Sequence, residues 1–172
     1  MMKTATLCAM GLLASSTAMA ADSGYEAFVQ GGHTQGSSPG QLINQFAVGV
    51  GVGLPWSFRD GRVSSRLDAS LAYIDTKRGD VAQATVMPVL RYQPSAVGYF
   101  VDAGLGLSYV SKQRWSRSHD LGSNFHFASR IGGGYDFGKY AVGLNLSHIS
   151  NAGLADHNDG ANQVDIRMSW KF

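Results

Sequence analysis

A histidine and a serine, His148 and Ser150, lie two positions apart in a segment whose apolar and polar residues alternate. Side chains of a β-strand point alternately to its two faces, so Val142, Leu144 and Leu146 share one face. His148 and Ser150 have the same parity as this apolar row. Their types and spacing fit a general base that activates a hydroxyl nucleophile. A polar group in apolar surroundings costs free energy, so the pair needs a functional reason.

The N-terminus has the features of a secretory signal peptide. Lys3 precedes an apolar stretch over residues 5–13, and a small-x-small cleavage site ends at Ala20. The apolar stretch is too short to cross a bilayer as a helix. We therefore expect a signal peptide over residues 1–20 and a single domain over residues 21–172.

Composition narrows the function classes. The net charge of +2 is close to neutral and the basic residues are scattered, so we expect no nucleic-acid partner. The only cysteine, Cys8, lies in the expected signal peptide, so the rest of the chain offers no disulfide and no thiolate metal site. The sequence contains no run of about 18 apolar residues, so we expect no transmembrane helix. Neither a cofactor nor a metal is implied.

Eight segments instead alternate with a period of two residues. Each has large apolar side chains on one face and small or charged side chains on the other, which is the pattern of half-buried β-strands. The segments span residues 24–33, 42–54, 63–74, 81–93, 98–110, 124–137, 140–150 and 162–172.

The two faces of these segments distinguish a membrane barrel from a soluble β-sandwich. Charges of both signs, such as Arg66 and Asp68, fall on the non-apolar faces, and aromatic residues gather near the segment ends. A sandwich would bury the apolar faces against a second sheet, whereas an outer-membrane barrel turns them toward lipid. We therefore predict an all-β fold, an eight-stranded antiparallel up-and-down transmembrane β-barrel in the bacterial outer membrane.

The lengths of the connections predict the orientation, because such barrels have short periplasmic turns and longer external loops. The expected periplasmic connections are 55–62, 94–97 and 138–139, and the external ones are 34–41, 75–80, 111–123 and 151–161. His148 and Ser150 would then lie near the external end of a lipid-facing wall. A barrel of this size is filled by its own side chains, so we expect no wide pore.

The residues around this pair resemble the signature of a known family. The pattern consists of His148-x-Ser150-Asn151-Ala152-x-Leu154, followed by Asn158-x-Gly160, and of the upstream run Asn124–Phe137. It resembles the PagL-type lipid A 3-O-deacylases, outer-membrane barrels that hydrolyse the ester of the 3-hydroxyacyl chain at position 3 of lipid A. The resemblance implies a carboxylic ester hydrolase acting on the lipid A of lipopolysaccharide, with His148 as base and Ser150 as nucleophile.

At the third catalytic position this chain departs from one pattern of the family. Some relatives have glutamate at the position that matches Asn162. Asn162 has the parity of Val164, so we expect its side chain to point outward beside His148. An amide oxygen can accept a hydrogen bond from the imidazole and fix its tautomer, but it supplies no charge. Asp156 and Asp159, in the adjoining loop, are the alternative acids.

Further groups are expected around the pair. For the oxyanion we expect the Asn151 side chain and backbone N–H groups near Gly153 or Asn158. An apolar groove for the acyl chain would be formed by Leu144, Leu146, Val164 and Ile166. The basic residues Lys112, Arg114 and Arg117 would bind the phosphates of lipopolysaccharide, or they form a merely solvated loop. A homodimer is compatible with the sequence.

Two other functions are compatible with such a barrel. One is a non-enzymatic adhesion or structural protein, and the other is an acyltransferase that moves an acyl chain onto lipid A. The mass of lipid A from cells that express the protein separates the three. A deacylase removes one hydroxyacyl group, an acyltransferase adds a chain, and a structural barrel changes nothing.

Overall fold

The computed structural model describes residues 24–35, 42–76 and 78–172. The expected signal peptide over residues 1–20 lies outside the described residues and stays a prediction. No helix in the described part of the chain is long and apolar enough to cross a membrane.

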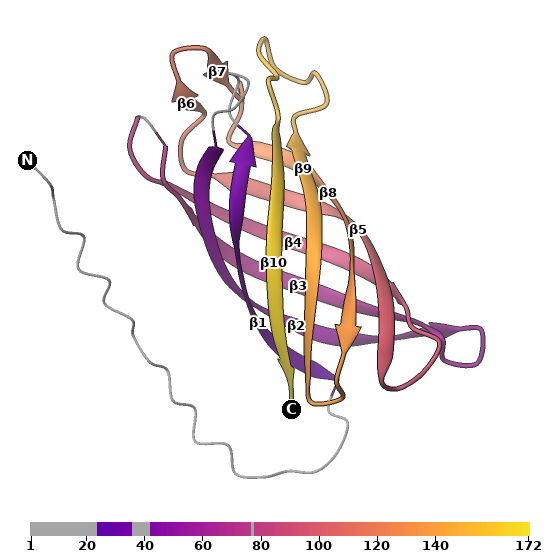
Figure 1. Ribbon diagram of the computed structural model, residues 1–172. Helices are drawn as coiled ribbons and strands as arrows, with labels where there is room; N and C mark the ends of the chain where they lie inside the picture. Colours follow the sequence, from indigo (N-terminus) through magenta and orange to yellow (C-terminus); the bar gives the residue numbers. More distant parts are fainter. Residues whose placement is uncertain (1–23, 36–41, 77) are drawn as a thin grey trace, which may run out of the picture.

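Eight long strands close into one barrel in the order β1-β10-β9-β8-β5-β4-β3-β2 (Figure 1). All of the pairings are antiparallel, and β1 pairs with β10 to close the barrel. The strands are β1 Tyr25–Gln35, β2 Leu42–Phe58, β3 Val63–Ile74, β4 Val81–Tyr92, β5 Gly98–Val110, β8 Phe125–Asp136, β9 Tyr140–Ser150 and β10 Ala161–Lys171. This confirms the eight-stranded antiparallel barrel predicted from the alternating pattern.

The structure differs from the sequence prediction in the external connection 111–123. Two short strands, β6 Arg114–Ser116 and β7 His119–Asp120, form a separate hairpin there. Strands this short show no period-two pattern, so the sequence gives no signal for them. In Figure 1 the hairpin lies at the upper end of the barrel, beside the connection from β9 to β10.

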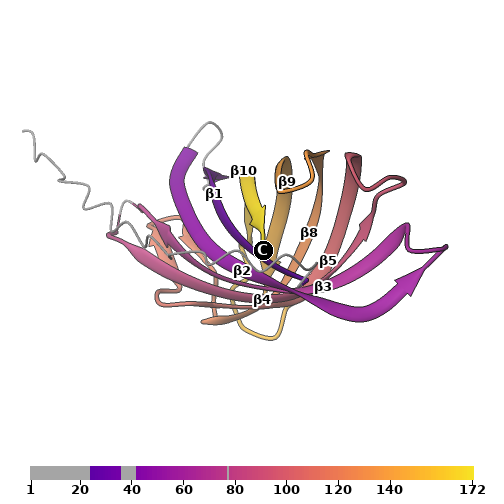
Figure 2. The same cartoon turned by 90° about the horizontal axis from the view of Figure 1, so that it is seen from below.

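Strand β2 is longer than expected and shortens the predicted turn at 55–62. A register shift between Leu54 and Ser57 lets the strand continue past Pro55, and the Ser65 hydroxyl donates to the Trp56 carbonyl at 2.7 Å. A bulge accommodates the missing N–H of a proline, which otherwise indicates the end of a strand. The resulting β2–β3 hairpin projects beyond the neighbouring turns (Figure 2).

Buried ion pairs fill the lumen, as expected for the non-apolar faces of the strands. Asp68 pairs with Arg66, Arg130 and Arg167, and Asp102 pairs with Arg66 and Arg91. Two lumenal aromatic rings add to this layer: the guanidinium groups of Arg167 and Arg91 lie 3.5 and 3.8 Å from the ring centroids of Phe28 and Phe100. Within the described residues, ion pairs and rings thus pack against one another across the interior.

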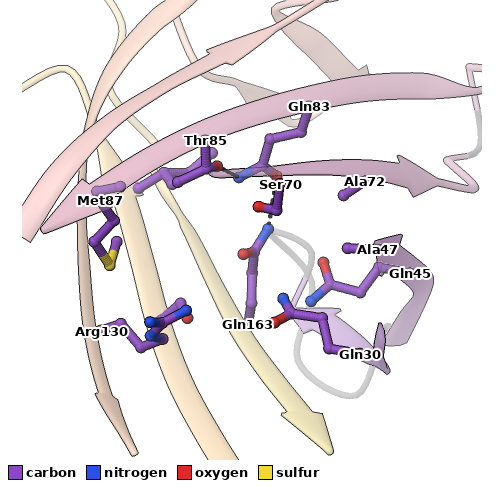
Figure 3. Close-up of a pocket in the computed structure, with 13 residues that line it drawn as sticks. Gln30, Gln45, Ala47, Ser70, Ala72, Gln83, Thr85, Met87, Arg130 and Gln163 are labelled. Carbon is purple, nitrogen blue, oxygen red and sulfur yellow. Dashed lines mark hydrogen bonds between the residues drawn. The ribbon is translucent and has the colours of Figure 1, made fainter. Parts of the chain in front are cut away.

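A cavity of about 40 Å³ lies in the external half of the lumen. Its lining is mostly polar, and the Gln163 amide donates to Gln83 at 2.9 Å across it (Figure 3). Pockets that bind small organic ligands typically measure about 300–1,000 Å³. This space is too small for a long acyl chain.

The outer surface of the barrel is apolar, because the alternation places the large side chains outward. Leu144 and Leu146 on β9 are 51% and 50% exposed. In the strand register they lie opposite Ile166 and Val164 on β10. These four residues form a continuous outward-facing wall, and the exposed aromatic residues near the strand ends flank it; that the wall holds an acyl chain stays a prediction.

Candidate active site

The apolar wall is interrupted by polar side chains near the external ends of β8, β9 and β10. The register places Ser129 of β8 and Asn162 of β10 on either side of His148 in β9. Ser150 follows on the same face of β9, opposite Phe127. Because all four polar residues have outward parity, they form one polar site on a surface that is otherwise lipid-like.

Asn162 is the residue that contacts the candidate base. Its side-chain oxygen, Oδ1, lies 2.8 Å from Nδ1 of His148. An amide oxygen only accepts, so this contact places a proton on Nδ1 and leaves Nε2 free to accept one. The parity argument therefore led to a residue that does reach the imidazole.

Ser150 is partly exposed and its hydroxyl oxygen accepts hydrogen bonds from the following loop. The backbone N–H of Ala152 donates to Oγ at 3.0 Å, and the amide Nδ2 of Asn158 lies 3.5 Å from it. Within the described residues, no hydrogen bond joins Ser150 to His148 directly. Bonds between nucleophile and base are often long before substrate binds and tighten in the complex.

The side chain of Asn151 is used inside the loop and does not face Ser150. It is 2% exposed, and its Nδ2 donates to the carbonyls of Leu121 and His157 at 2.9 and 2.6 Å. Its Oδ1 accepts from the N–H of Gly153 at 2.9 Å. These bonds direct the Asn151 amide and the Gly153 N–H into the loop, away from Ser150, so neither is placed as the oxyanion donor expected from the sequence.

At Asn158 the group near the hydroxyl of Ser150 is the side-chain amide Nδ2, and not the backbone N–H expected from the sequence. The backbone N–H of Ala152, directly before Gly153, is one of the backbone donors expected near that residue, and it reaches Oγ. Its φ of 56° places Ala152 in the left-handed region, in a tight turn directly after the strand. That turn, rather than the residue type, aims the N–H back at Oγ. A small residue followed by Gly153 was the available sequence signal.

The alternative acids lie apart from the imidazole. Asp156 is exposed and makes no hydrogen bond to His148 within the described residues. Asp159 directs Oδ2 toward the backbone N–H of Asp120 in the β6–β7 hairpin, at 2.6 Å. Neither carboxylate is placed to orient the base in this structure.

The three basic residues all lie in or beside the β6–β7 hairpin. Lys112 and Arg117 are exposed, whereas Arg114 donates from Nε and Nη2 to Asp120 at 2.8 and 2.6 Å. Together with the backbone N–H of Gly122, this contact holds the pKa of Asp120 below its usual range. In the described part of the chain, no group of three or more His, Cys, Asp or Glu residues is placed to hold a metal ion.

Fold and site together define a class: a closed, lipid-walled β-barrel that groups a serine, a histidine and an amide on its outer wall, as a membrane-embedded ester hydrolase requires. The family model described as lipid A 3-O-deacylase (PagL) matches residues 44–171, and the chain belongs to this family.

Proteins of the family resemble the chain in sequence and in structure. The lipid A deacylase PagL of Bordetella bronchiseptica is 31% identical over 126 residues, 68% of this chain and 70% of that protein. The Pseudomonas aeruginosa protein of the same name is 32% identical over 116 residues, 64% of this chain and 66% of that protein. The crystal structure of the outer membrane enzyme PagL has a TM-score of 0.75 at 26% identity, over 86% of this chain and 99% of the other. The chain is thus a carboxylic ester hydrolase of the bacterial outer membrane.

Gly160 lies against the edge of the imidazole and gives the first test of the site. A Cβ at this position would lie 3.0 Å from Cε1 of His148 and 3.0 Å from the Ile149 carbonyl, and φ is +61°. We expect Gly160→Ala to displace the ring and to lower kcat for ester hydrolysis about tenfold. Steady-state kinetics of the purified barrel measure this.

The matched control for this change is Gly61→Ala in the periplasmic β2–β3 turn. Gly61 also has a positive φ, +84°, but a Cβ there would have nothing within 4 Å. It therefore carries the same backbone strain without the contact. Equal activities of the two variants would contradict the role of Gly160.

Proposed function

We propose that the protein is a lipid A 3-O-deacylase, which hydrolyses the ester at position 3 of lipid A and releases a 3-hydroxy fatty acid. The observation that carries the proposal is the His148–Asn162 contact of 2.8 Å beside Ser150 on a lipid-facing wall. The names of the relatives, lipid A deacylases, support lipid A as the substrate.

In the proposed mechanism Ser150 is the nucleophile and His148 the base. Oγ attacks the ester carbonyl carbon while Nε2 of the imidazole takes the hydroxyl proton. The carbonyl oxygen becomes an oxyanion, which the Ala152 N–H and the Asn158 amide stabilise. Collapse breaks the bond to the sugar oxygen, which leaves as a hydroxyl after taking the proton from His148.

The acyl group is then bound to Ser150 as an ester. His148 takes a proton from water, and the resulting hydroxide attacks the acyl carbonyl carbon. The second tetrahedral intermediate collapses, the proton returns to Oγ of Ser150, and the 3-hydroxy fatty acid leaves. The balance needs only water as the second substrate, and no cofactor takes part.

The substrate would be held without leaving the membrane. The wall of Leu144, Leu146, Val164 and Ile166 lies directly below the site on β9 and β10, so the acyl chain can lie along it in the outer leaflet. Lys112 beside the hairpin and Arg117 within it would meet the phosphates, whereas the guanidinium of Arg114 is already paired with Asp120. A homodimer stays a prediction.

Mass spectrometry of lipid A tests the proposal. We expect lipid A from cells that express the protein to lose the mass of one 3-hydroxyacyl group, with the free 3-hydroxy fatty acid recovered. Cells that carry the empty vector are the control. Unchanged lipid A would favour a non-enzymatic barrel, and a gain of one acyl chain would favour an acyltransferase; either result refutes the deacylase.

A further inference from the structure

The β6–β7 hairpin is docked on the loop that follows Ser150, although about thirty residues separate them in the sequence. The backbone N–H of Asp120 donates to Oδ2 of Asp159 at 2.6 Å. In return, the backbone N–H of Asp159 donates to the Asp120 carbonyl at 3.3 Å. Figure 1 shows the hairpin and the β9–β10 connection side by side at the upper end of the barrel.

A second contact joins the hairpin to the residue next to the nucleophile. Asn151 donates from Nδ2 to the Leu121 carbonyl and to the His157 carbonyl. Gly122 packs so closely on this loop that a Cβ there would overlap the His157 carbonyl oxygen. The buried Asn151 amide therefore connects two parts of the β9–β10 loop, Asn151 and His157, to Leu121 at the end of the hairpin.

The hairpin also packs behind the site. Trp115 and Leu121 are fully buried, in the same apolar cluster as Ile149 and Ala161. Ile149 lies between His148 and Ser150 in the chain, and Ala161 directly precedes Asn162. Ile149 and Ala161 thus point inward, into the buried cluster that contains the hairpin residues. Their neighbours in the two strands point outward into the site.

The buried ring of His119 completes this packing. Its centroid lies 5.6 Å from that of Trp115. Burial lowers its pKa, against the opposing influence of Asp159, the Gly160 backbone and Asp120. Burial therefore disfavours the charged form of this imidazole beside the site.

These contacts determine where the oxyanion donor lies. The backbone N–H of Asn151 donates to Oδ1 of Asn158 at 3.0 Å, which turns Nδ2 of Asn158 toward Ser150. We propose that the β6–β7 hairpin is a positioning element of the active site, with Asn151 and Asp159 as positioning residues that hold Asn158 against the nucleophile. This inference rests on the proposed deacylase function.

Asp159 allows a sharp test. If it only positions the loop, Asp159→Asn should keep the activity, whereas if it acts as an acid, Asp159→Asn should lose it. Asp159→Asn keeps an oxygen that accepts from the Asp120 N–H, whereas Asp159→Ala removes it. We expect Asp159→Ala to lower kcat about tenfold with KM changed less than about twofold, and Asp159→Asn to retain at least about half of the activity. Asp156→Ala, in the same loop and exposed, is the control and should behave as wild type.

Gly122→Ala tests the hairpin side of the contact without removing any polar group, because the added methyl group acts only by its overlap with the His157 carbonyl. The added methyl group would push the hairpin off the loop and should also lower kcat about tenfold. Gly61→Ala again controls for the backbone strain, since Gly122 has a φ of +71° and Gly61 one of +84°. The heat-dependent gel shift of folded barrels verifies that each variant is folded.

The rate at which a fluorophosphonate probe labels Ser150 serves as a second readout, because it needs no lipid A. Slower labelling of Asp159→Ala and Gly122→Ala, with Asp159→Asn near wild type, supports the inference. Wild-type rates in the two alanine variants would overturn it. An Asp159→Asn variant as slow as Asp159→Ala would do the same, because it would assign the effect to the charge. If the wild type labels but leaves lipid A intact, the proposed function fails while the labelling ratios still decide the role of the hairpin.

Discussion

Lipid A should keep its 3-hydroxyacyl chain in cells that express Ser150→Ala or His148→Ala. The first change removes the atom that forms the acyl-enzyme, and the second removes the group that takes its proton. In enzymes of this type, loss of nucleophile or base lowers kcat by about 10⁴-fold or more, and removing both costs little more than removing one. We therefore expect the double variant to be as inactive as either single variant.

The measurement is the mass of lipid A together with the kinetics of the purified barrel. Matched controls are Ser64→Ala at the periplasmic end of β3 and His33→Ala in β1, both exposed. A Ser150→Ala barrel that deacylates at the wild-type rate would refute the acyl-enzyme mechanism. A His148→Ala barrel that stays active would refute only the role of the base.

Much of the fold follows from one repeated pattern. Alternation over about ten residues determines both that a segment is a strand and which of its faces is apolar, so the barrel wall and its outward rows were predictable. The same parity placed Asn162 beside His148, because β9 and β10 are neighbouring antiparallel strands and the structure pairs these residues directly.

The parts of the site that the sequence does not predict are those that depend on loop contacts. That Asn151 bonds to the Leu121 carbonyl depends on how two loops dock, and no periodicity links residues thirty positions apart. Ser129 is a different case. It breaks the outward apolar row of β8, a signal that was present in the sequence, but only the strand register shows that it lies beside His148.

The proposed active site lies on the outer wall, so catalysis there would be separate from the contacts that stabilise the barrel from inside. The buried ion pairs of Asp68 and Asp102 hold the strands together from inside, and none of their partners faces the site. The proposed site consists of outward side chains on β9 and β10 and of the loop that contacts the β6–β7 hairpin. Substitutions in the site are therefore expected to change activity with little effect on folding.

The amide at position 162 gives the second large effect. Asn162→Ala removes the only acceptor seen for Nδ1 among the described residues, so the imidazole is free to rotate and to adopt the tautomer that cannot act as base. We expect kcat to fall by about 10–100-fold. Asn44→Ala is a close control, because Asn44 lies opposite His33 near the external end of β2, as Asn162 lies opposite His148.

Asn162→Glu should have the opposite effect. A carboxylate keeps an acceptor for Nδ1 and adds a negative charge that stabilises the imidazolium formed in the transition state. At this exposed site the added charge is worth about 1 kcal/mol, so kcat should rise by about fivefold. Because the same charge favours the protonated imidazole in the resting enzyme, the acid limb of the pH–rate profile should move to higher pH. A Glu variant with unchanged kcat and an unchanged profile would show that residue 162 acts on His148 through geometry alone.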